Sequence, residues 1–180
     1  MKATLRTLVA VAAFASLAPS VSHATDGQIT FTGTIKAQTC QINGNGTGSK
    51  NFTVALPPVS ITSLAQGGTT AGRTAFTISL TNCSPATGNV YTHFEPSDTI
   101  NTASGNLLNA EGTASNVEVG VLNNPDTSII KLGSANENSK PVALENGAAT
   151  LAYYAQYVAM GGPATAGTVK TSALYSIVYQ

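Results

Sequence analysis

The side chains that could carry chemistry in this chain are two cysteines and two histidines, Cys40, Cys83, His23 and His93. Such residues supply nucleophiles, general acids and bases, and ligands for transition metals. A metal site usually needs three or four of them together, and an activated nucleophile needs a base within hydrogen-bonding reach. His93 lies in an ordinary strand-like run, and the acidic residues are scattered singly. We therefore expect no catalytic, metal or cofactor site; a hydrolase that uses His93 is the weakest alternative.

The first 24 residues have the pattern of a secretory signal. Lys2 and Arg6 precede an apolar run from Leu8 to Leu17, and Ser22-His23-Ala24 is a small-x-small cleavage site. The run is too short for a transmembrane helix, and no later segment approaches the roughly 20 apolar residues that such a helix needs. We expect cleavage after Ala24, export from the cytoplasm and no membrane insertion.

Removing residues 1–24 from the 180-residue chain leaves 156 residues, enough for one domain with a hydrophobic core. His93 is then the only histidine. Without Lys2 and Arg6, six of the eight Lys/Arg remain against eight Asp/Glu, a formal charge of about −2. Nucleic acids and anionic membranes bind basic patches, so this sparsely charged chain favours neither as a partner.

Cys40 and Cys83 remain in the exported chain, where two cysteines most simply form one disulfide. The bond would close a loop of 43 positions. In the chain-entropy model, such a loop stabilises the fold by roughly 4 kcal/mol.

The rest of the chain has the composition of a β-protein, rich in Thr, Val, Gly, Asn and Ser and poor in strong helix formers. Turn-forming residues separate seven runs of strand character, which predict an all-β sandwich of the immunoglobulin type. An Asn146-Gly147 turn predicts a hairpin from Val142–Leu144 to Ala148–Val158, and Ser60–Ala65 predicts one helical turn. The expected strands are Gln28–Ile35, Phe52–Leu56, Phe76–Thr81, Val90–Phe94, Val117–Leu122, Thr150–Val158 and Leu174–Tyr179.

The first and last of these strands are unusual. Ile29, Phe31, Gly33 and Ile35 alternate with threonines, and glycine inside a strand often marks close backbone approach. This strand either packs in its own sheet or leaves its domain to fill a groove in another; the pattern does not decide. At the other end, Tyr175, Ile177 and Tyr179 share one face of a strand with no turn or polar tail after it. We expect a core face there with one open side.

Four local patterns in order resemble the major pilins of type 1-like fimbriae that the chaperone–usher pathway assembles. Thr30–Ile35 followed by Thr39-Cys40 is similar to the family's amino-terminal donor strand and first cysteine. Phe76–Cys83 resembles the strand with the second cysteine, and Tyr154–Tyr157 with Ala164–Gly167 resembles the penultimate hairpin. Tyr179 is penultimate, and Gly167 is fourteenth from the end, where the family's assembly motif has a glycine.

The resemblance implies an incomplete immunoglobulin-like sandwich, the pilin fold, that lacks its last strand and is completed in trans by a donor strand. It divides the chain into a signal peptide (1–24), a donor-strand extension (25–38) and a pilin domain (39–180). Ile29, Phe31, Gly33 and Ile35 would then enter a neighbour's groove. Gly167, Tyr175, Ile177 and Tyr179 would form the subunit's own groove and assembly motif.

The implied partners are identical or homologous pilins in a head-to-tail polymer, a periplasmic chaperone and an outer-membrane usher. The expected location is the cell surface, reached through the periplasm. The expected function is that of a fimbrial shaft subunit supporting cell adhesion. Two alternatives stay open: a minor or adaptor subunit, and a secreted lectin-like binding module that uses tyrosines on its surface. Those tyrosines would be Tyr91, Tyr153, Tyr154 and Tyr157.

Overall fold

The computed structural model describes residues 26–33, 39–135 and 137–180 of the chain. The chain divides into two units, Met1–Ile35 and Lys36–Gln180. In the first unit, residues 26–33 form neither helix nor strand, and the side chains of Ile29 and Phe31 are 79% and 89% exposed. The strand predicted over Gln28–Ile35 is thus not paired in its described part. Ile35 and the predicted signal (1–24) lie outside the described residues.

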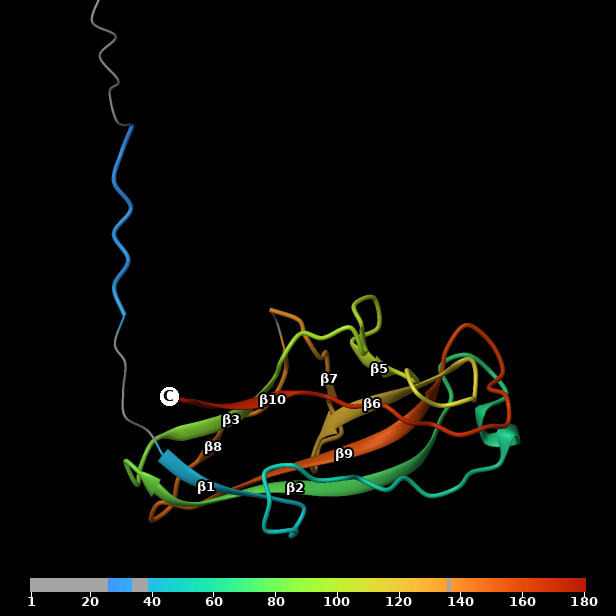
Figure 1. Cartoon of the computed structure of the whole chain (residues 1–180), viewed down its shortest axis with the longest axis horizontal. Coiled ribbons are helices and arrows are strands. Elements are labelled where there is room, and N and C mark those ends of the chain that lie inside the picture. Colours follow the sequence, from blue (N-terminus) through green and yellow to red (C-terminus); the bar gives the residue numbers. More distant parts are fainter. Residues whose placement is uncertain (1–25, 34–38, 136) are drawn as a thin grey trace, which may run out of the picture. The chain divides into compact units, whose positions relative to one another are not determined.

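The second unit is all-β apart from one turn of 3₁₀ helix, η1, so the predicted fold class is confirmed (Figure 1). Its helix and strands are η1 (Ile61–Leu64), β1 (Thr39–Gly44), β2 (Thr70–Ser84), β3 (Asn89–Phe94), β4 (Ile100–Asn101), β5 (Asn106–Leu108), β6 (Val117–Asn123), β7 (Ile129–Ile130), β8 (Val142–Ala143), β9 (Ala149–Ala159) and β10 (Tyr175–Tyr179).

The strands form two sheets. The larger has the order β1-β2-β9-β6-β5-β4, with β7 also paired to β6, and the smaller has the order β10-β3-β8. Every strand pair is antiparallel. In the smaller sheet β10 pairs only with β3, from Tyr175 opposite Phe94 to Tyr179 opposite Val90. Within the described residues, the other edge of β10 is therefore unpaired.

The hydrophobic core lies between the sheets, and alternation along the strands builds it. Phe76, Ile78 and Leu80 of β2 are buried at every second position, as expected for a strand with one face on the core. Tyr153 of β9 is 1% exposed, and its hydroxyl donates a hydrogen bond to Oγ1 of Thr92 at 2.9 Å. This bond joins the two sheets inside the core. Burial raises the pKa of Tyr153.

Three local predictions have clear outcomes. The helical turn is confirmed as η1, because the Ser60 side chain accepts a hydrogen bond from the Thr62 amide as an N-cap. The Asn146-Gly147 turn is confirmed by paired hydrogen bonds between Glu145 and Ala148. The hairpin predicted around this turn is wrong, because its two arms lie in different sheets: β8 pairs with β3 in the smaller sheet, and β9 joins the larger one.

The strand predicted over Phe52–Leu56 is also wrong, since these residues form no ladder. Their side chains still alternate, with Phe52, Val54 and Leu56 half-buried and Thr53 and Ala55 exposed. The segment therefore has the shape of a strand without a partner strand. No helix among the described residues is long and apolar enough to span a membrane.

Candidate functional site

A groove of about 840 Å³ opens along one side of the sandwich. One lip is Lys50–Leu56, which follows β1, and the other is Val169–Ile177, which runs into β10. The floor between the lips consists mainly of apolar core side chains from both sheets. The floor residues are Ile42, Phe76, Ile78, Phe94, Leu107, Val119, Val121, Ala155 and Tyr157.

The backbone along the second lip is bonded on one side only. The carbonyls of Thr168, Lys170 and Leu174 accept hydrogen bonds from the amides of neighbouring segments at 2.9–3.0 Å, and the carbonyl of Ser172 accepts one from the Thr99 hydroxyl. Between these residues, Val169, Thr171 and Ala173 have half-buried side chains and, within the described chain, no backbone partner. Alternate backbone groups of an extended segment point to opposite edges, so their amides and carbonyls face the groove.

The first lip has the same property. No backbone hydrogen bond joins residues 52–57 to any other described segment. Two extended lips with free backbone groups, above an apolar floor, have the geometry of a sheet from which one strand is missing. Such a groove can accept an extended peptide, which would supply main-chain partners and fill the pockets with alternate side chains.

The structure places Tyr175, Ile177 and Tyr179 against the hydrophobic core, as the alternation predicts. All three are half-buried, and Tyr175 and Ile177 line the groove. Burial raises the pKa of Tyr175 and of Tyr179. Tyr179 packs on the core without lining the groove, beside Val90 of β3.

Tyr175 spans the groove at one end. Its hydroxyl donates to the carbonyl of Lys50 at 2.7 Å, and its ring meets the edge of Phe52 at 6.2 Å between centroids. Phe52 contacts Phe76 at 6.1 Å, and Phe76 contacts Tyr153 at 5.5 Å. This aromatic chain ties both lips to the core. Sequence reasoning found Tyr175 but missed Phe52 as its partner, because the alternation of Phe52, Val54 and Leu56 does not say what lies opposite.

Gly167 lies eight positions before Tyr175, outside the lining of the groove. It lines a smaller adjoining pocket of about 290 Å³, which shares Tyr157 and Val169 with the groove. A Cβ at Gly167 would come within 2.5 Å of the Ala114 amide nitrogen. Close packing against Ala114 therefore already requires glycine here, and a role in assembly stays a prediction.

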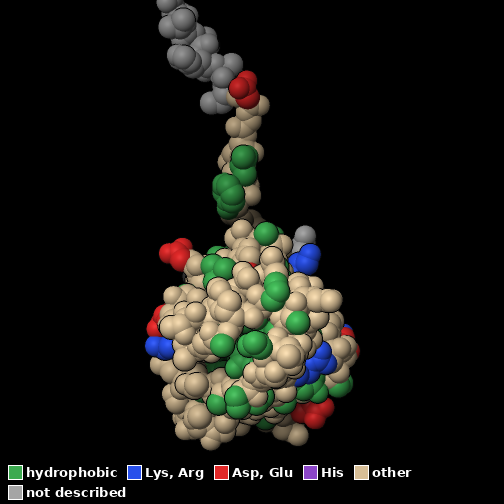
Figure 2. Space-filling model, turned by 90° about the vertical axis from the view of Figure 1, so that its right-hand side faces the viewer, with side chains coloured by type: hydrophobic (Ala, Val, Ile, Leu, Met, Phe, Trp, Pro, Cys, Tyr) green, Lys and Arg blue, Asp and Glu red, His purple; other side chains and the backbone are tan. Residues whose placement is uncertain are grey.

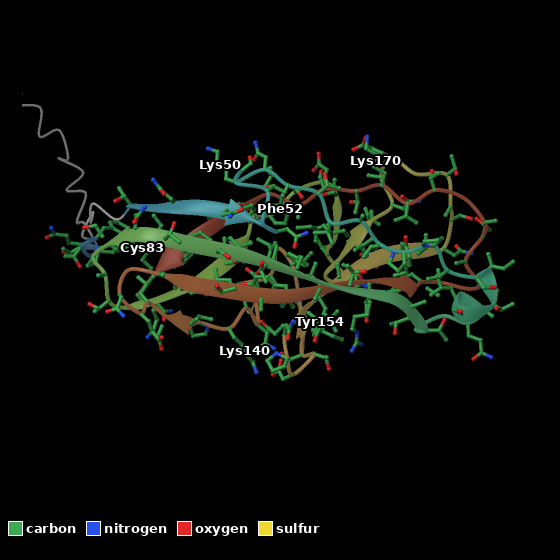
Figure 3. The ribbon with its side chains drawn as sticks, turned by 90° about the horizontal axis from the view of Figure 1, so that it is seen from below. Lys50, Phe52, Cys83, Lys140, Tyr154 and Lys170 are labelled. Atoms are coloured by element: carbon green, nitrogen blue, oxygen red, sulfur yellow. A yellow bond between two sulfur atoms is a disulfide. The ribbon has the colours of Figure 1, made fainter. Side chains whose placement is uncertain are left out.

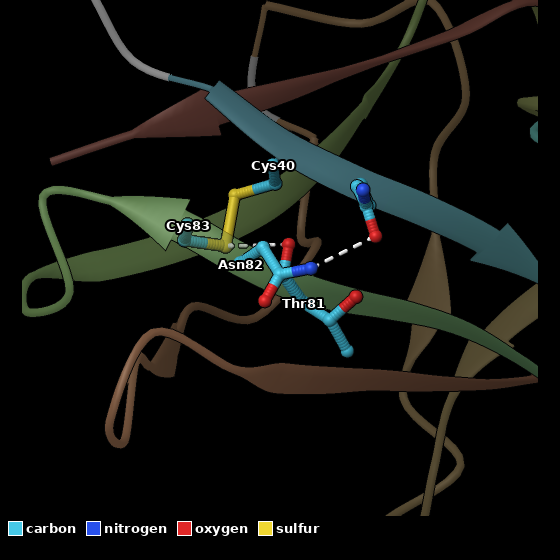
Figure 4. The surroundings of a disulfide bond; sticks show 5 residues. Cys40, Thr81, Asn82 and Cys83 are labelled. Carbon is cyan, nitrogen blue, oxygen red and sulfur yellow. Dashed lines mark hydrogen bonds between the residues drawn. A yellow bond between two sulfur atoms is a disulfide. The ribbon is translucent and has the colours of Figure 1, made fainter.

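The predicted disulfide between Cys40 and Cys83 is present and joins the start of β1 to the end of β2 (Figure 4). Beside it, the Asn82 side-chain amide donates to Oε1 of Gln41 at 2.9 Å. The disulfide and the pairing of β1 with β2 hold β1 on the larger sheet. The disulfide lies at the start of β1, the end farther from the first lip. The lip is thus anchored through β1, although its own backbone has no partner strand.

His93 lies on β3 in a small polar network. Its Nδ1 is 2.7 Å from Oε2 of Glu137, a side chain only 6% exposed that also accepts the Phe94 amide. Burial is the largest influence on Glu137 and raises the pKa of its carboxyl. Glu95 lies 3.7 Å from Nε2 of His93 and accepts the hydroxyl of Ser176 in β10 at 2.6 Å. The network thus fastens β10 and the segment around Glu137 to β3.

Charged side chains are few and dispersed on the domain surface. Figure 2 shows single blue and red groups among uncharged ones on the face that it draws. In Figure 3, Lys50 and Lys170 lie along one side of the domain, and Lys140 and Tyr154 lie on the opposite side. Nζ of Lys170 is 2.6 Å from Oε2 of Glu111, and this hydrogen bond raises the pKa of Lys170. The charge pattern gives no basic patch on the face drawn.

The four tyrosines that a binding module would use do not form one common surface. Tyr153 is in the core, whereas Tyr91, Tyr154 and Tyr157 are half-buried. Tyr154 lies under the Arg73 guanidinium at 5.8 Å, and Tyr157 lines the groove.

Comparison with known proteins gives one consistent family. The model of the family described as "Fimbrial protein" matches residues 29–180. The chain is 44% identical to the F17 fimbrial protein of Escherichia coli over 92% of its own length and 94% of that protein. It is 43% identical to the major fimbrial subunit SMF-1 of Stenotrophomonas maltophilia (strain K279a), over 90% of this chain and 97% of that protein.

Solved structures agree in fold. A subunit from the structure of a chaperone-usher pilus aligns with a TM-score of 0.60 at 22% identity, covering 91% of this chain and all of that one. The P pilus rod subunit PapA aligns with a TM-score of 0.58 at 19% identity, covering 78% and 99%. At these identities the likeness concerns the fold alone. The family match and the two relatives carry the assignment: the chain belongs to the fimbrial protein family.

Proposed function

We propose that the protein is the repeating structural subunit of a surface fimbria and polymerises by donor-strand exchange. Residues 25–38 of one copy enter the groove of the pilin domain, residues 39–180, of the next copy. Export begins with the signal at residues 1–24. The observation that carries the proposal is the groove itself, with its two unpaired lips above an apolar floor.

The extension has the chemistry that the groove needs. Ile29 and Phe31 are almost fully exposed in their own subunit, which is costly for large apolar side chains and is explained when another copy buries them. Burying Ile29, Phe31 and Ile35 should contribute on the order of 5–9 kcal/mol, at about 1.5–3 kcal/mol for each side chain. Hydrogen bonds between the donor backbone and the free groups of the lips add to this.

The same groove explains the need for a chaperone and an usher. An apolar groove with free backbone edges is prone to aggregation until it is filled. A periplasmic chaperone protects it, and an outer-membrane usher exchanges the chaperone for the next extension. Because donor and groove are different surfaces, the contact is head-to-tail and builds a fibre. The fibre, rather than any reaction at His93, is the product of the protein.

Deleting residues 25–37 tests the proposal. Expressed with its chaperone, the truncated subunit should remain soluble and chaperone-bound and should form no denaturant-resistant multimers, whereas the full chain forms them. A truncated chain that folds as a stable monomer without chaperone would contradict the proposal and would favour the secreted binding module. A minor or adaptor subunit shares the groove and the extension, and its low copy number in purified fimbriae would distinguish it.

A further inference from the structure

One arginine on the larger sheet is held by its neighbours but has no acidic partner. Nε of Arg73 donates a hydrogen bond to Oε1 of Gln156 at 2.8 Å, and Gln156 is only 6% exposed. The guanidinium carbon lies 5.8 Å from the centre of the Tyr154 ring, within the range of a cation–π contact. Among the described residues, no carboxylate forms an ion pair with Arg73. The side chain is thus positioned, while its charge is left without a partner.

A β-bulge presents this arginine. The pairing of β2 with β9 shifts register between Ala71 and Thr74, so that Gly72 and Arg73 together face the single residue Gln156. Gly72 has a φ of +67°, in the left-handed region that favours glycine. Bulges are frequent beside functional sites, where they change the direction of a side chain. The backbone of β2 therefore departs from the regular ladder at the residue that carries the unpaired charge.

The free part of the guanidinium suits one kind of ligand. Because Nε is bonded to Gln156, the two terminal NH2 groups of Arg73 remain, and they have no hydrogen-bond partner within the described chain. Two NH2 groups in one plane can donate parallel hydrogen bonds to both oxygens of a carboxylate, and the positive charge strengthens these bonds. Tyr154 is half-buried, so part of its ring is exposed beside this position. Aromatic rings with one exposed face offer an apolar surface next to a polar contact.

The arginine lies away from the assembly groove. Tyr154 and Gln156 alternate along β9 with residues of the core, so they lie on the outer face of the larger sheet. Figure 3 places Tyr154 on the side of the domain opposite Lys50 and Lys170, which belong to the two lips of the groove. Neither Tyr154 nor Arg73 lines the groove. A donor strand in the groove therefore leaves Arg73 exposed, and a fimbria carries this arginine once in every subunit.

We propose that Arg73 and Tyr154 form a binding site for the carboxylate of an acidic saccharide, such as a uronic acid. The terminal nitrogens of Arg73 donate to the carboxylate, and the exposed part of the Tyr154 ring contacts the sugar that carries it. This inference goes beyond the proposed function, because it gives the structural subunit a ligand of its own.

The surface around Arg73 favours a saccharide over a second copy of the chain. The neighbouring outward-facing side chains of β2 and β9 are small or carry hydroxyl groups, which suit the hydroxyls of a sugar. They are Ala75, Thr77, Ser79, Thr150 and Ala152. Interfaces between proteins usually centre on large apolar or aromatic anchors. Among the described residues, none of the exposed large apolar side chains lies on β2 or β9.

Repetition along a fimbria compensates for a weak single site. One arginine on a surface with few and dispersed charges attracts an anion only at short range, so each site binds weakly. A polysaccharide with a carboxylate on every sugar can bind several subunits at once. Such avidity can exceed the affinity of one site by about 10²–10⁴. A polyuronate is therefore the form of acidic saccharide that a polymer of this subunit would hold.

Binding of purified fimbriae to immobilised polygalacturonate tests the site. Arg73→Gln should lower the affinity about tenfold or more, and Arg73→Lys, which keeps the charge but not the planar pair of NH2 groups, should lower it several-fold. Gln156→Glu keeps the shape of the site but supplies the missing acidic partner, so it should lower the affinity as much as Arg73→Gln. Free galacturonate should compete with the polymer, whereas galactose, which has the same ring without the carboxylate, should not.

Lys140→Gln is the matched control. It removes one positive charge from the same side of the domain as Tyr154, where Lys140 already pairs with Asp126 (Figure 3). It should change the affinity less than about twofold. Subunits immobilised at high density should show the same order of variants, so the site can be tested even if the chain forms no fimbriae and the proposed function fails.

Four results would overturn the inference. Wild-type fimbriae that do not bind polygalacturonate would exclude the site, and equal competition by galactose would show that the carboxylate is not recognised. Equal losses for Arg73→Gln and Lys140→Gln would show a general effect of charge. A lower guanidinium midpoint for Arg73→Gln fimbriae, with unchanged polygalacturonate binding, would instead indicate that Arg73 contacts a second copy of the chain.

Discussion

Truncating Phe31 to alanine should weaken the fimbria without affecting the fold of the subunit. The Phe31 side chain is 89% exposed in its own chain, so its removal deletes almost no packing there. Under the proposed donor-strand exchange it becomes buried in the polymer, and burying a phenylalanine stabilises by about 1.5–3 kcal/mol. Since about 1.4 kcal/mol corresponds to a factor of ten, each junction should weaken by roughly 10–150-fold.

Two assays separate an effect on the stability of the fimbria from an effect on the fold of the subunit. Purified fimbriae are incubated in graded guanidinium, and the multimer fraction is measured on denaturing gels without boiling; the midpoint should fall for Phe31→Ala. The yield of the soluble complex between chaperone and subunit should match wild type. Thr30→Ala is the matched control, because it changes the neighbouring residue on the opposite face of the donor, and it should shift the midpoint little.

Two results would refute this reasoning. An unchanged dissociation midpoint would show that Phe31 is not buried between subunits. A loss of chaperone-bound subunit, with no change in the stability of those fimbriae that do form, would show that Phe31 belongs to the subunit's own fold.

Two further predictions concern the domain itself. Replacing both Cys40 and Cys83 by serine removes a cross-link over 43 positions, worth roughly 4 kcal/mol in the chain-entropy model, and should lower the periplasmic level of the subunit on immunoblots; unchanged levels would contradict a stabilising disulfide. Glu137→Gln should flatten the pH dependence of fimbrial stability. Burial raises the pKa of Glu137 in the folded state, so the folded chain holds this proton more tightly than the unfolded chain does. The protonated carboxyl therefore contributes its full share of folding stability at pH values below the ordinary pKa of glutamate. That share is lost as the pH rises through the folded-state pKa. The guanidinium midpoint of fimbrial dissociation, measured from pH 4 to 7, should therefore fall with pH more steeply for wild type than for Glu137→Gln. Parallel curves of midpoint against pH would refute this role of Glu137.

Strong alternation made most of the long strands predictable. Phe76–Thr81, Val90–Phe94, Val117–Leu122 and Thr150–Val158 all lie within observed strands. A half-buried strand imposes a period of two on its side chains, as β2 and β3 show, whereas β6 is buried at every position. The strands β4, β5 and β7 were missed, because they are two or three residues long and too short to show a period; β1 (Thr39–Gly44) was missed as well. The prediction over Val142–Leu144 does cover β8, and it was wrong only in the strand with which β8 pairs.

The failures near the groove have a different cause. Phe52–Leu56 has the pattern of a strand, but pairing depends on a neighbour that the pattern does not name. For the same reason, alternation identified the inward face of Tyr175 and Ile177 but not the lip opposite them. The sequence likewise gives no signal that the Thr171 hydroxyl on the second lip is buried, since only the three-dimensional packing shows it.

The groove is held open from its ends. The first lip is fixed through β1 and the disulfide on one side, and on the other by η1, where the Leu64 carbonyl accepts the Ala164 amide at 2.9 Å. The second lip is fixed by its bonds to neighbouring segments and by the pairing of β10 with β3. Between these anchors neither lip has a backbone partner within the described residues, although the Tyr175 side chain reaches from the second lip to Lys50 and Phe52 of the first. The less a donor strand has to reorganise these lips when it binds, the more of the free energy of burying it is available to hold one subunit on the next.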